Sequence, residues 1–206
     1  MKRSFGILLL ILCALCAQAN SLVNGDFEAG NVNFTSAYTW GSALGDQATY
    51  TIDTSMEIWA PGFRDHTSGS GNMMIINGAV DTSKMFWSQT VDVVSGVEYT
   101  FTGFAADLTY APTPQIQLLV NGADKGQFSV VDTPSAVWQE FSFIWTASAT
   151  ESVNLELYDL AGASNGDDFA IDDLSMVPEP ASAALIGLAS ILLIATRRTI
   201  HHYSTV

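Results

Sequence analysis

The chain has 206 residues, with 21 acidic against 7 basic side chains, and a formal net charge of −14 at pH 7. An acidic surface of this kind repels phosphate backbones, which excludes nucleic-acid binding as its function. The only cysteines are Cys13 and Cys16. Both lie near the start of the chain, so the rest offers no disulfide, thiolate metal site or cysteine nucleophile.

Residues 1–19 have the pattern of a secretory signal peptide. Lys2 and Arg3 precede an apolar stretch, and Ala17 and Ala19 supply the small residues that a cleavage site needs. We therefore expect signal peptidase to remove this segment and the protein to be exported.

Residues 20–177, about 158 residues, are expected to form one domain with room for a sizeable core. The basic residues of this segment are Arg64, Lys84 and Lys125, against twenty acidic ones, a formal charge of about −17. Such a composition suits an exported soluble protein. It also offers oxygen ligands to hard cations such as Ca²⁺.

The apolar periodicity of this domain is two rather than 3.6, which indicates strands. Phe141, Phe143 and Trp145 share one face, for example, and Glu140 and Ser142 the other. The pattern predicts two antiparallel sheets packed as a β-sandwich, because each strand has one face to bury, although a closed barrel fits it as well. The predicted strands are 22–23, 48–53, 73–77, 86–93, 98–106, 115–121, 126–131, 137–146, 152–159 and 169–176.

Several motifs occur along this domain in a characteristic order. They are "SLVNGDFEAG" at 21–30, "SGSGNMMIING" at 69–78, "WSQTVDVVSGVEYTFTGFAA" at 87–106, "LLVNG" at 118–122, "VWQEFSFIWTA" at 137–147 and "FAIDDLSMV" at 169–177. Together they resemble the galactose-binding-like jelly rolls, which include carbohydrate-binding modules of families 4 and 22. The resemblance implies an all-β antiparallel jelly roll and an association with polysaccharide.

The same resemblance implies a structural calcium site where the first and last motifs meet. The matching residues are Asp26, Glu28, Asp172 and Asp173. Neighbouring carboxylates repel one another unless they are protonated or bridged, and Ca²⁺ takes six to eight oxygen ligands. The alternative is that these side chains are simply solvated at the ends of strands.

Aromatic residues in turn-rich connections are the candidates for ligand binding, because exposed rings stack on sugar faces. The alternative for each is a ring that caps the open end of the core. Trp87 and Trp138 begin strands and are expected to be core or corner residues. The candidates are Tyr38, Trp40, Trp59, Phe63 and Tyr110.

Catalytic residues are scarce, and we predict none. His66 is the only histidine before the C-terminal tail, and Asp65 and Ser68 lie near it in sequence. Adjacency does not orient a base toward a nucleophile, so a surface-loop histidine is the favoured interpretation. The protein is expected not to be an enzyme, with the paired carboxylates of a glycosidase as the alternative.

The C-terminal residues 178–206 contain a Pro-Glu-Pro sequence, an uncharged apolar run at 181–196 and an arginine pair. As a helix the run spans about 24 Å, slightly less than a hydrocarbon core of about 30 Å. The three parts resemble the PEP-CTERM sorting signal of bacterial envelope proteins, which implies cleavage by an exosortase after transient inner-membrane anchoring. An ordinary C-terminal transmembrane helix is the alternative. The motif residues are Pro178, Glu179, Pro180, Arg197 and Arg198.

The sequence therefore predicts an exported, non-catalytic protein of the cell surface or extracellular matrix, sorted through an exosortase and associated with extracellular polysaccharide. Two alternatives remain: a carbohydrate-binding module with a defined glycan ligand, and an exported glycoside-active enzyme.

Overall fold

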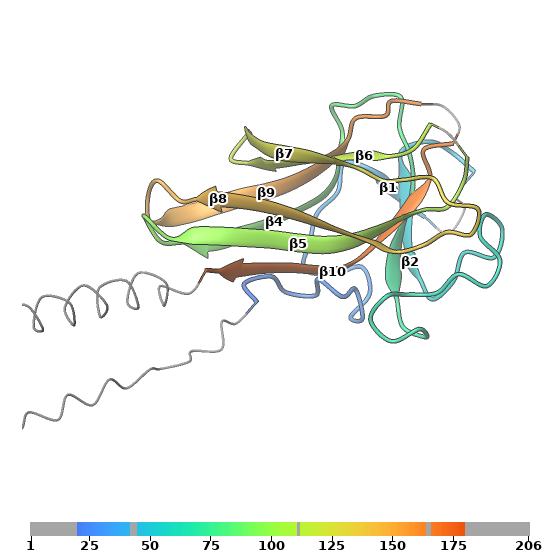
Figure 1. Cartoon of the computed structure of the whole chain (residues 1–206), viewed down its shortest axis with the longest axis horizontal. Coiled ribbons are helices and arrows are strands. Elements are labelled where there is room, and N and C mark those ends of the chain that lie inside the picture. Colours follow the sequence, from blue (N-terminus) through green and yellow to red (C-terminus); the bar gives the residue numbers. More distant parts are fainter. Residues whose placement is uncertain (1–19, 42–44, 111, 164–165, 180–206) are drawn as a thin grey trace, which may run out of the picture.

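The structure is a computed structural model that describes residues 20–41, 45–110, 112–163 and 166–179. In these ranges the chain forms a six-stranded sheet of order β1-β2-β3-β10-β5-β8 and a four-stranded sheet of order β4-β9-β6-β7 (Figure 1). All pairs are antiparallel except β1 with β2. The two sheets are separate layers, so the predicted β-sandwich is confirmed and the closed barrel is not formed.

The strands alternate with turns and irregular loops, and the bounds of all except β1, which was not predicted, lie close to the predicted ones. They are β1 (Thr39–Trp40), β2 (Thr49–Asp53), β3 (Met73–Asn77), β4 (Met85–Val93), β5 (Glu98–Asp107), β6 (Gln115–Val120), β7 (Ala123–Ser129), β8 (Gln139–Thr146), β9 (Glu151–Asp159) and β10 (Phe169–Pro178).

The predicted terminal segments lie largely outside the described residues. These are the signal peptide 1–19, the membrane helix 181–196 and the motif residues Pro180, Arg197 and Arg198. Within the ranges that are described, no helix is long and apolar enough to cross a membrane.

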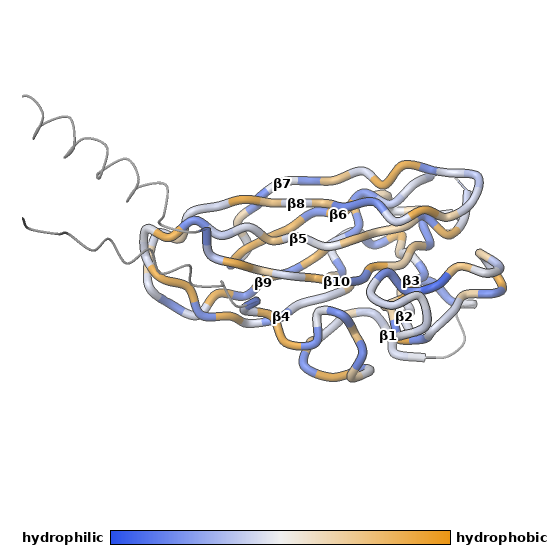
Figure 2. The backbone as a smooth tube through the Cα atoms, turned by 60° about the horizontal axis from the view of Figure 1, so that its bottom comes forward, coloured by the Kyte–Doolittle hydropathy of each residue, from blue (hydrophilic) through white to orange (hydrophobic). Residues whose placement is uncertain are grey.

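The main core lies between the sheets and is built from alternate residues of each strand. Phe101 of β5, Phe141 and Phe143 of β8, and Leu155 and Leu157 of β9 are buried there. In Figure 2, hydrophobic and hydrophilic segments alternate along the chain. Because a strand turns successive side chains to opposite faces, this alternation places one face of each strand in the core.

Two local predictions were wrong. β7 begins at Ala123 rather than near 126, because Asn121 and Gly122 adopt φ of 49° and 75° and close a tight two-residue hairpin turn. Residues 22–23 form no strand, although the Ser21 N–H donates to the Met176 carbonyl at 2.8 Å.

β3 is buried on both faces of the six-stranded sheet. Met74 and Ile76 enter the main core, whereas Met73 and Ile75 lie in a second apolar cluster with Met56, Leu108 and Ala170. Alternate residues of a strand point to opposite faces, so the second cluster lies on the outer face of the six-stranded sheet. Trp59, Ala60, Phe63, Ala136 and Trp138 pack against it.

The ends of the described chain lie at one end of the sandwich, on the left in Figure 1. In the pairing of β5 with β10, Tyr99 faces Pro178 and Asp107 faces Phe169. Strands rise about 3.3 Å per residue, which separates these two positions by about 30 Å. The loops that follow Asp107 therefore lie at the end opposite to the chain ends.

Candidate functional site

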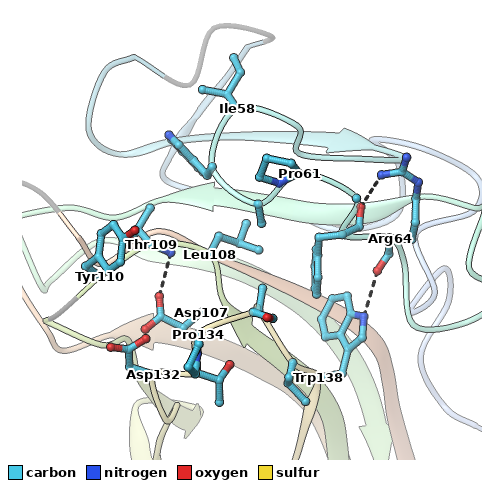
Figure 3. A pocket seen from close by; sticks show the side chains of 18 of the residues that line it. Ile58, Pro61, Arg64, Asp107, Leu108, Thr109, Tyr110, Asp132, Pro134 and Trp138 are labelled. Atoms are coloured by element: carbon cyan, nitrogen blue, oxygen red, sulfur yellow. Dashed lines mark hydrogen bonds between the residues drawn. The ribbon is translucent and has the colours of Figure 1, made fainter.

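An open pocket of about 1400 Å³ lies at this far end, over the outer face of the six-stranded sheet (Figure 3). Three segments that are distant in sequence form it: 58–65 from the connection of β2 to β3, 107–110 at the end of β5, and 132–138 before β8. Their convergence follows from the pairing of β5 with β8 and of β10 with β3 and β5.

Aromatic rings form much of the pocket wall. The ring centroids of Phe63 and Trp138 are 4.9 Å apart, and the indole Nε1 of Trp138 donates to the Arg64 carbonyl at 3.0 Å. Trp59 is half-buried beside them, and Tyr110 stands at the rim with 85% of its surface exposed. The wall therefore combines rings fixed by packing with one that is free to adapt.

The loop that carries Trp59 and Phe63 is held by its own hydrogen bonds. The Arg64 guanidinium donates to Glu57 at 2.7 Å, and the Gly62 N–H donates to the other oxygen of Glu57 at 3.1 Å. The hydrogen bond from Arg64 is the main reason why the pKa of Glu57 lies below its usual value. The positive charge nearest to the pocket is thus already paired with a carboxylate of the same loop.

Two carboxyl groups, Asp107 and Asp132, meet on the opposite side of the pocket and point toward one another in Figure 3. Asp107 is 2% exposed; its Oδ1 accepts from the Thr109 N–H at 3.0 Å, while its buried Oδ2 has no hydrogen-bond partner among the described residues. Together, burial, the opposing Thr109 hydrogen bond and the charge of Asp132 raise the pKa of Asp107 to about 6, and burial is the largest cause. Asp132 is exposed.

The structure separates the five aromatic candidates into two groups. Trp59, Phe63 and Tyr110 line the pocket. Trp40 is exposed elsewhere, with its ring 5.3 Å from that of Tyr50, and Tyr38 is only 5% exposed because it packs in the core against Phe86.

Sequence reasoning misplaced one pocket residue, Trp138. It was expected to be a core or corner residue like Trp87, which is indeed fully buried, yet Trp138 lies in the pocket wall. The available signal was its position after the turn-rich segment 132–137, the same context that singled out Tyr110.

The four predicted calcium ligands are divided between two surroundings. Asp26 and Asp173 line a small pocket between the segment 20–26 and residues 173–175 of β10. Glu28 instead accepts from the Asn72 N–H at 3.0 Å, and Asp172 is buried and accepts from the His66 N–H at 2.8 Å. In the described part of the chain, no three His, Cys, Asp or Glu side chains gather in a group that would hold a metal.

The residues therefore fit calcium only in part. Burial is the main cause that raises the pKa of Asp172 to about 7. Calcium binding stays a prediction, and no functional step below depends on it.

His66 lies outside any catalytic arrangement within the described ranges. Its Nδ1 lies 2.6 Å from Asp173 Oδ2, and its ring stacks on Phe104 at 3.6 Å. The Ser68 hydroxyl donates to Asp65 at 3.1 Å, so it is paired with the acid rather than with the imidazole. Asp65, His66 and Ser68 therefore do not form a catalytic triad.

No protein-family model matches the chain, and no curated protein matches it either. Solved structures do. A Stig cyclase from Fischerella sp. TAU is similar with a TM-score of 0.57 and 9% identity, over 78% of this chain and 97% of the cyclase.

The enzymatically active domain of bacteriophage CBA120 tailspike protein 4 has a TM-score of 0.51 and 12% identity, over 78% of this chain. This chain spans only 21% of that tailspike domain. Carbohydrate-binding modules also occur among the similar structures; the xylan-binding CBM22-1 domain from Paenibacillus barcinonensis has a TM-score of 0.47 and 13% identity, over 74% of this chain and 90% of that domain. At these identities the likeness shows the fold, a β-sandwich of the jelly-roll kind, and leaves function to be argued from the site.

Proposed function

We propose that the protein is an exported, non-catalytic protein of the cell surface or extracellular matrix, and that its jelly roll binds extracellular polysaccharide in the aromatic-walled pocket. Signal peptidase removes residues 1–19, and an exosortase processes the segment 178–206 after transient anchoring in the inner membrane. The observation that carries the binding proposal is the set of rings, Trp59, Phe63, Tyr110 and Trp138, around one open pocket.

The chemistry of the pocket suits a sugar chain. Aromatic faces stack on the apolar faces of pyranose rings, and nearby carboxylates and backbone groups accept hydrogen bonds from hydroxyls. The hydrogen bond from Trp138 to the Arg64 carbonyl fixes the indole before a ligand arrives. A ring held in place loses little conformational entropy on binding, which favours affinity.

The position of the pocket suits a domain that is attached to the cell surface near Pro178. It opens about 30 Å along β10 from Pro178, where the described chain approaches the sorting segment. A domain held at that end, before or after processing, would turn its pocket away from the attachment point.

Binding fits the pocket better than glycoside hydrolysis. Asp107 has the raised pKa of a general acid, but its Oδ2 is buried rather than presented at the pocket surface, where a general acid would have to donate its proton. A reducing-end assay on each polysaccharide that binds would test this directly. Turnover that Asp107→Asn abolishes would favour the enzyme instead.

The test of binding is a polysaccharide panel in affinity electrophoresis and calorimetry, using the described domain and two tryptophan variants. Trp138→Ala should weaken binding at least about fivefold, since truncating a central aromatic anchor typically costs more than about 1 kcal/mol. Trp40→Ala is the matched control, because Trp40 is also exposed but lies outside the pocket. Equal losses of affinity in both tryptophan variants, or no binding to any polysaccharide of the panel, would refute the proposal.

Export and sorting require a separate test, which is intact-mass analysis of the protein from envelope and medium of its native host. The proposal expects a mass that lacks residues 1–19 and the segment after Pro180. A full-length protein in the cytoplasm would refute it.

A further inference from the structure

We infer that the Asp107–Asp132 corner of the pocket is a subsite for a cationic group of the ligand, which makes the preferred ligand a polysaccharide that carries free amino sugars. This inference rests on the proposed function, because it names the class of glycan that the same pocket selects.

The first observation is the arrangement of charge around the pocket. The charged residues that line it are Arg64, Asp65, Asp107 and Asp132. Arg64 is paired with Glu57 at 2.7 Å, and Asp65 accepts hydrogen bonds from the N–H groups of Ser68 and Gly71 at 2.7 and 2.8 Å. The uncompensated charge is therefore concentrated on Asp107 and Asp132.

The second observation is that Asp107 lacks a partner where burial makes one most necessary. Its Oδ2 is buried without a hydrogen bond from any residue that the structure describes, and the side chain points toward Asp132 (Figure 3). The charged groups that face Asp107 are Asp132 and, on the segment before β10, Asp168, both of them acidic. No basic side chain of the described part lowers the pKa of Asp107.

An ammonium group beside Asp132 would offset the repulsion between Asp107 and the acidic groups that face it. It would contact the exposed carboxylate of Asp132 directly and would be attracted by the buried charge of Asp107 beneath it. Asp107 thus acts as a positioning residue: its negative charge attracts the ammonium group without touching it, and Asp132 contacts that group directly. The aromatic ring of Tyr110 nearby suits a cation as well as a sugar face. Uronate or sulfate groups would be repelled at the same place.

The experiment compares β-1,4-linked hexamers that differ at one substituent: cellohexaose with a hydroxyl, chitohexaose with an acetamide, and the deacetylated hexamer with an amine. Calorimetry at low ionic strength should show the amine form binding about fivefold more tightly than the hydroxyl form, the size of one partly exposed ion pair. Asp132→Asn should abolish this preference, so that the amine and hydroxyl forms bind the variant equally. Glu151→Gln, which removes an exposed carboxylate at the start of β9, is the matched control and should keep the preference.

A pH series separates positioning by Asp107 from a merely structural role. It uses a hexamer trimethylated at nitrogen, because that charge is permanent whereas a free amine titrates. The preference over cellohexaose should fall as Asp107 protonates around pH 6, and Asp107→Asn should make it independent of pH in this range.

The outcomes distinguish the two proposals. Binding of neutral hexamers or polysaccharides without any gain from the amine overturns the cationic subsite and leaves the proposed function standing. A preference that survives Asp132→Asn, or that Glu151→Gln removes equally, shows a general effect of the acidic surface and also overturns it. Displacement of the amine form by millimolar Ca²⁺ alone would assign the corner to a metal cation instead. No binding of any glycan in the panel refutes both proposals.

Discussion

Replacing Asp107 by Asn should make the protein more stable at alkaline pH, because it removes a buried negative charge. Burial is the main cause that raises the pKa of Asp107 from its ordinary value of 3.8 to about 6. The folded state therefore binds a proton at this site more tightly than the unfolded state does. Asn mimics the protonated form and keeps an oxygen for the Thr109 N–H.

The sign and size follow from proton linkage. Below about pH 3 the carboxyl is neutral in both states and the variant should match the wild type; above about pH 6 the folded wild type holds an unfavourable buried charge. A pKa difference of about two corresponds to about 3 kcal/mol, and water at the pocket screens part of it. We expect the variant to be about 1 to 3 kcal/mol more stable at pH 8, with the difference falling to about 0.5 kcal/mol or less at pH 4.

Urea denaturation followed by tryptophan fluorescence, at pH 4 and pH 8, would measure both free energies of unfolding. Glu151→Gln serves as the control, because its exposed carboxylate should give a difference within about 0.5 kcal/mol at either pH. A variant that is less stable than the wild type at pH 8, or equally shifted at both pH values, would refute the assignment of Asp107 as a buried destabilising charge.

Two further changes test other parts of the fold. Gly78→Ala should lower the free energy of unfolding by more than about 2 kcal/mol, because its Cβ would lie 2.1 Å from Cγ of the buried Asp167, whereas Gly41→Ala has open space and should stay within about 0.5 kcal/mol in the same urea assay. If calcium links the segment around Asp26 to β10, EGTA should lower the melting temperature by several degrees in a thermal scan. The double variant Asp26→Asn/Asp173→Asn should remove that response. A melting temperature unaffected by EGTA would contradict the calcium prediction.

Local patterns in the sequence were sufficient for the layered architecture. The alternation along β8 correctly placed Phe141, Phe143 and Trp145 on one buried face, because a strand turns every second side chain to the same face. The order of the motifs likewise indicated the jelly roll. The boundary of β7 was missed, since it depends on the conformations of Asn121 and Gly122 rather than on hydrophobicity.

The site could be predicted only in part, because it depends on long-range pairing. Trp59 was selected as a loop aromatic, but nothing local distinguished it from Trp40, which lies outside the pocket. Trp138 and Trp87 both precede apolar alternations, and only the packing of loops over the outer face of β3 and β10 makes one a pocket wall and the other core. The raised pKa of Asp107 also depends on tertiary packing, because burial of its carboxyl group is the main cause. Sequence alone determined which side chains share a strand face, whereas the tertiary structure decided which faces are covered, since burial depends on segments that the register of distant strands brings together.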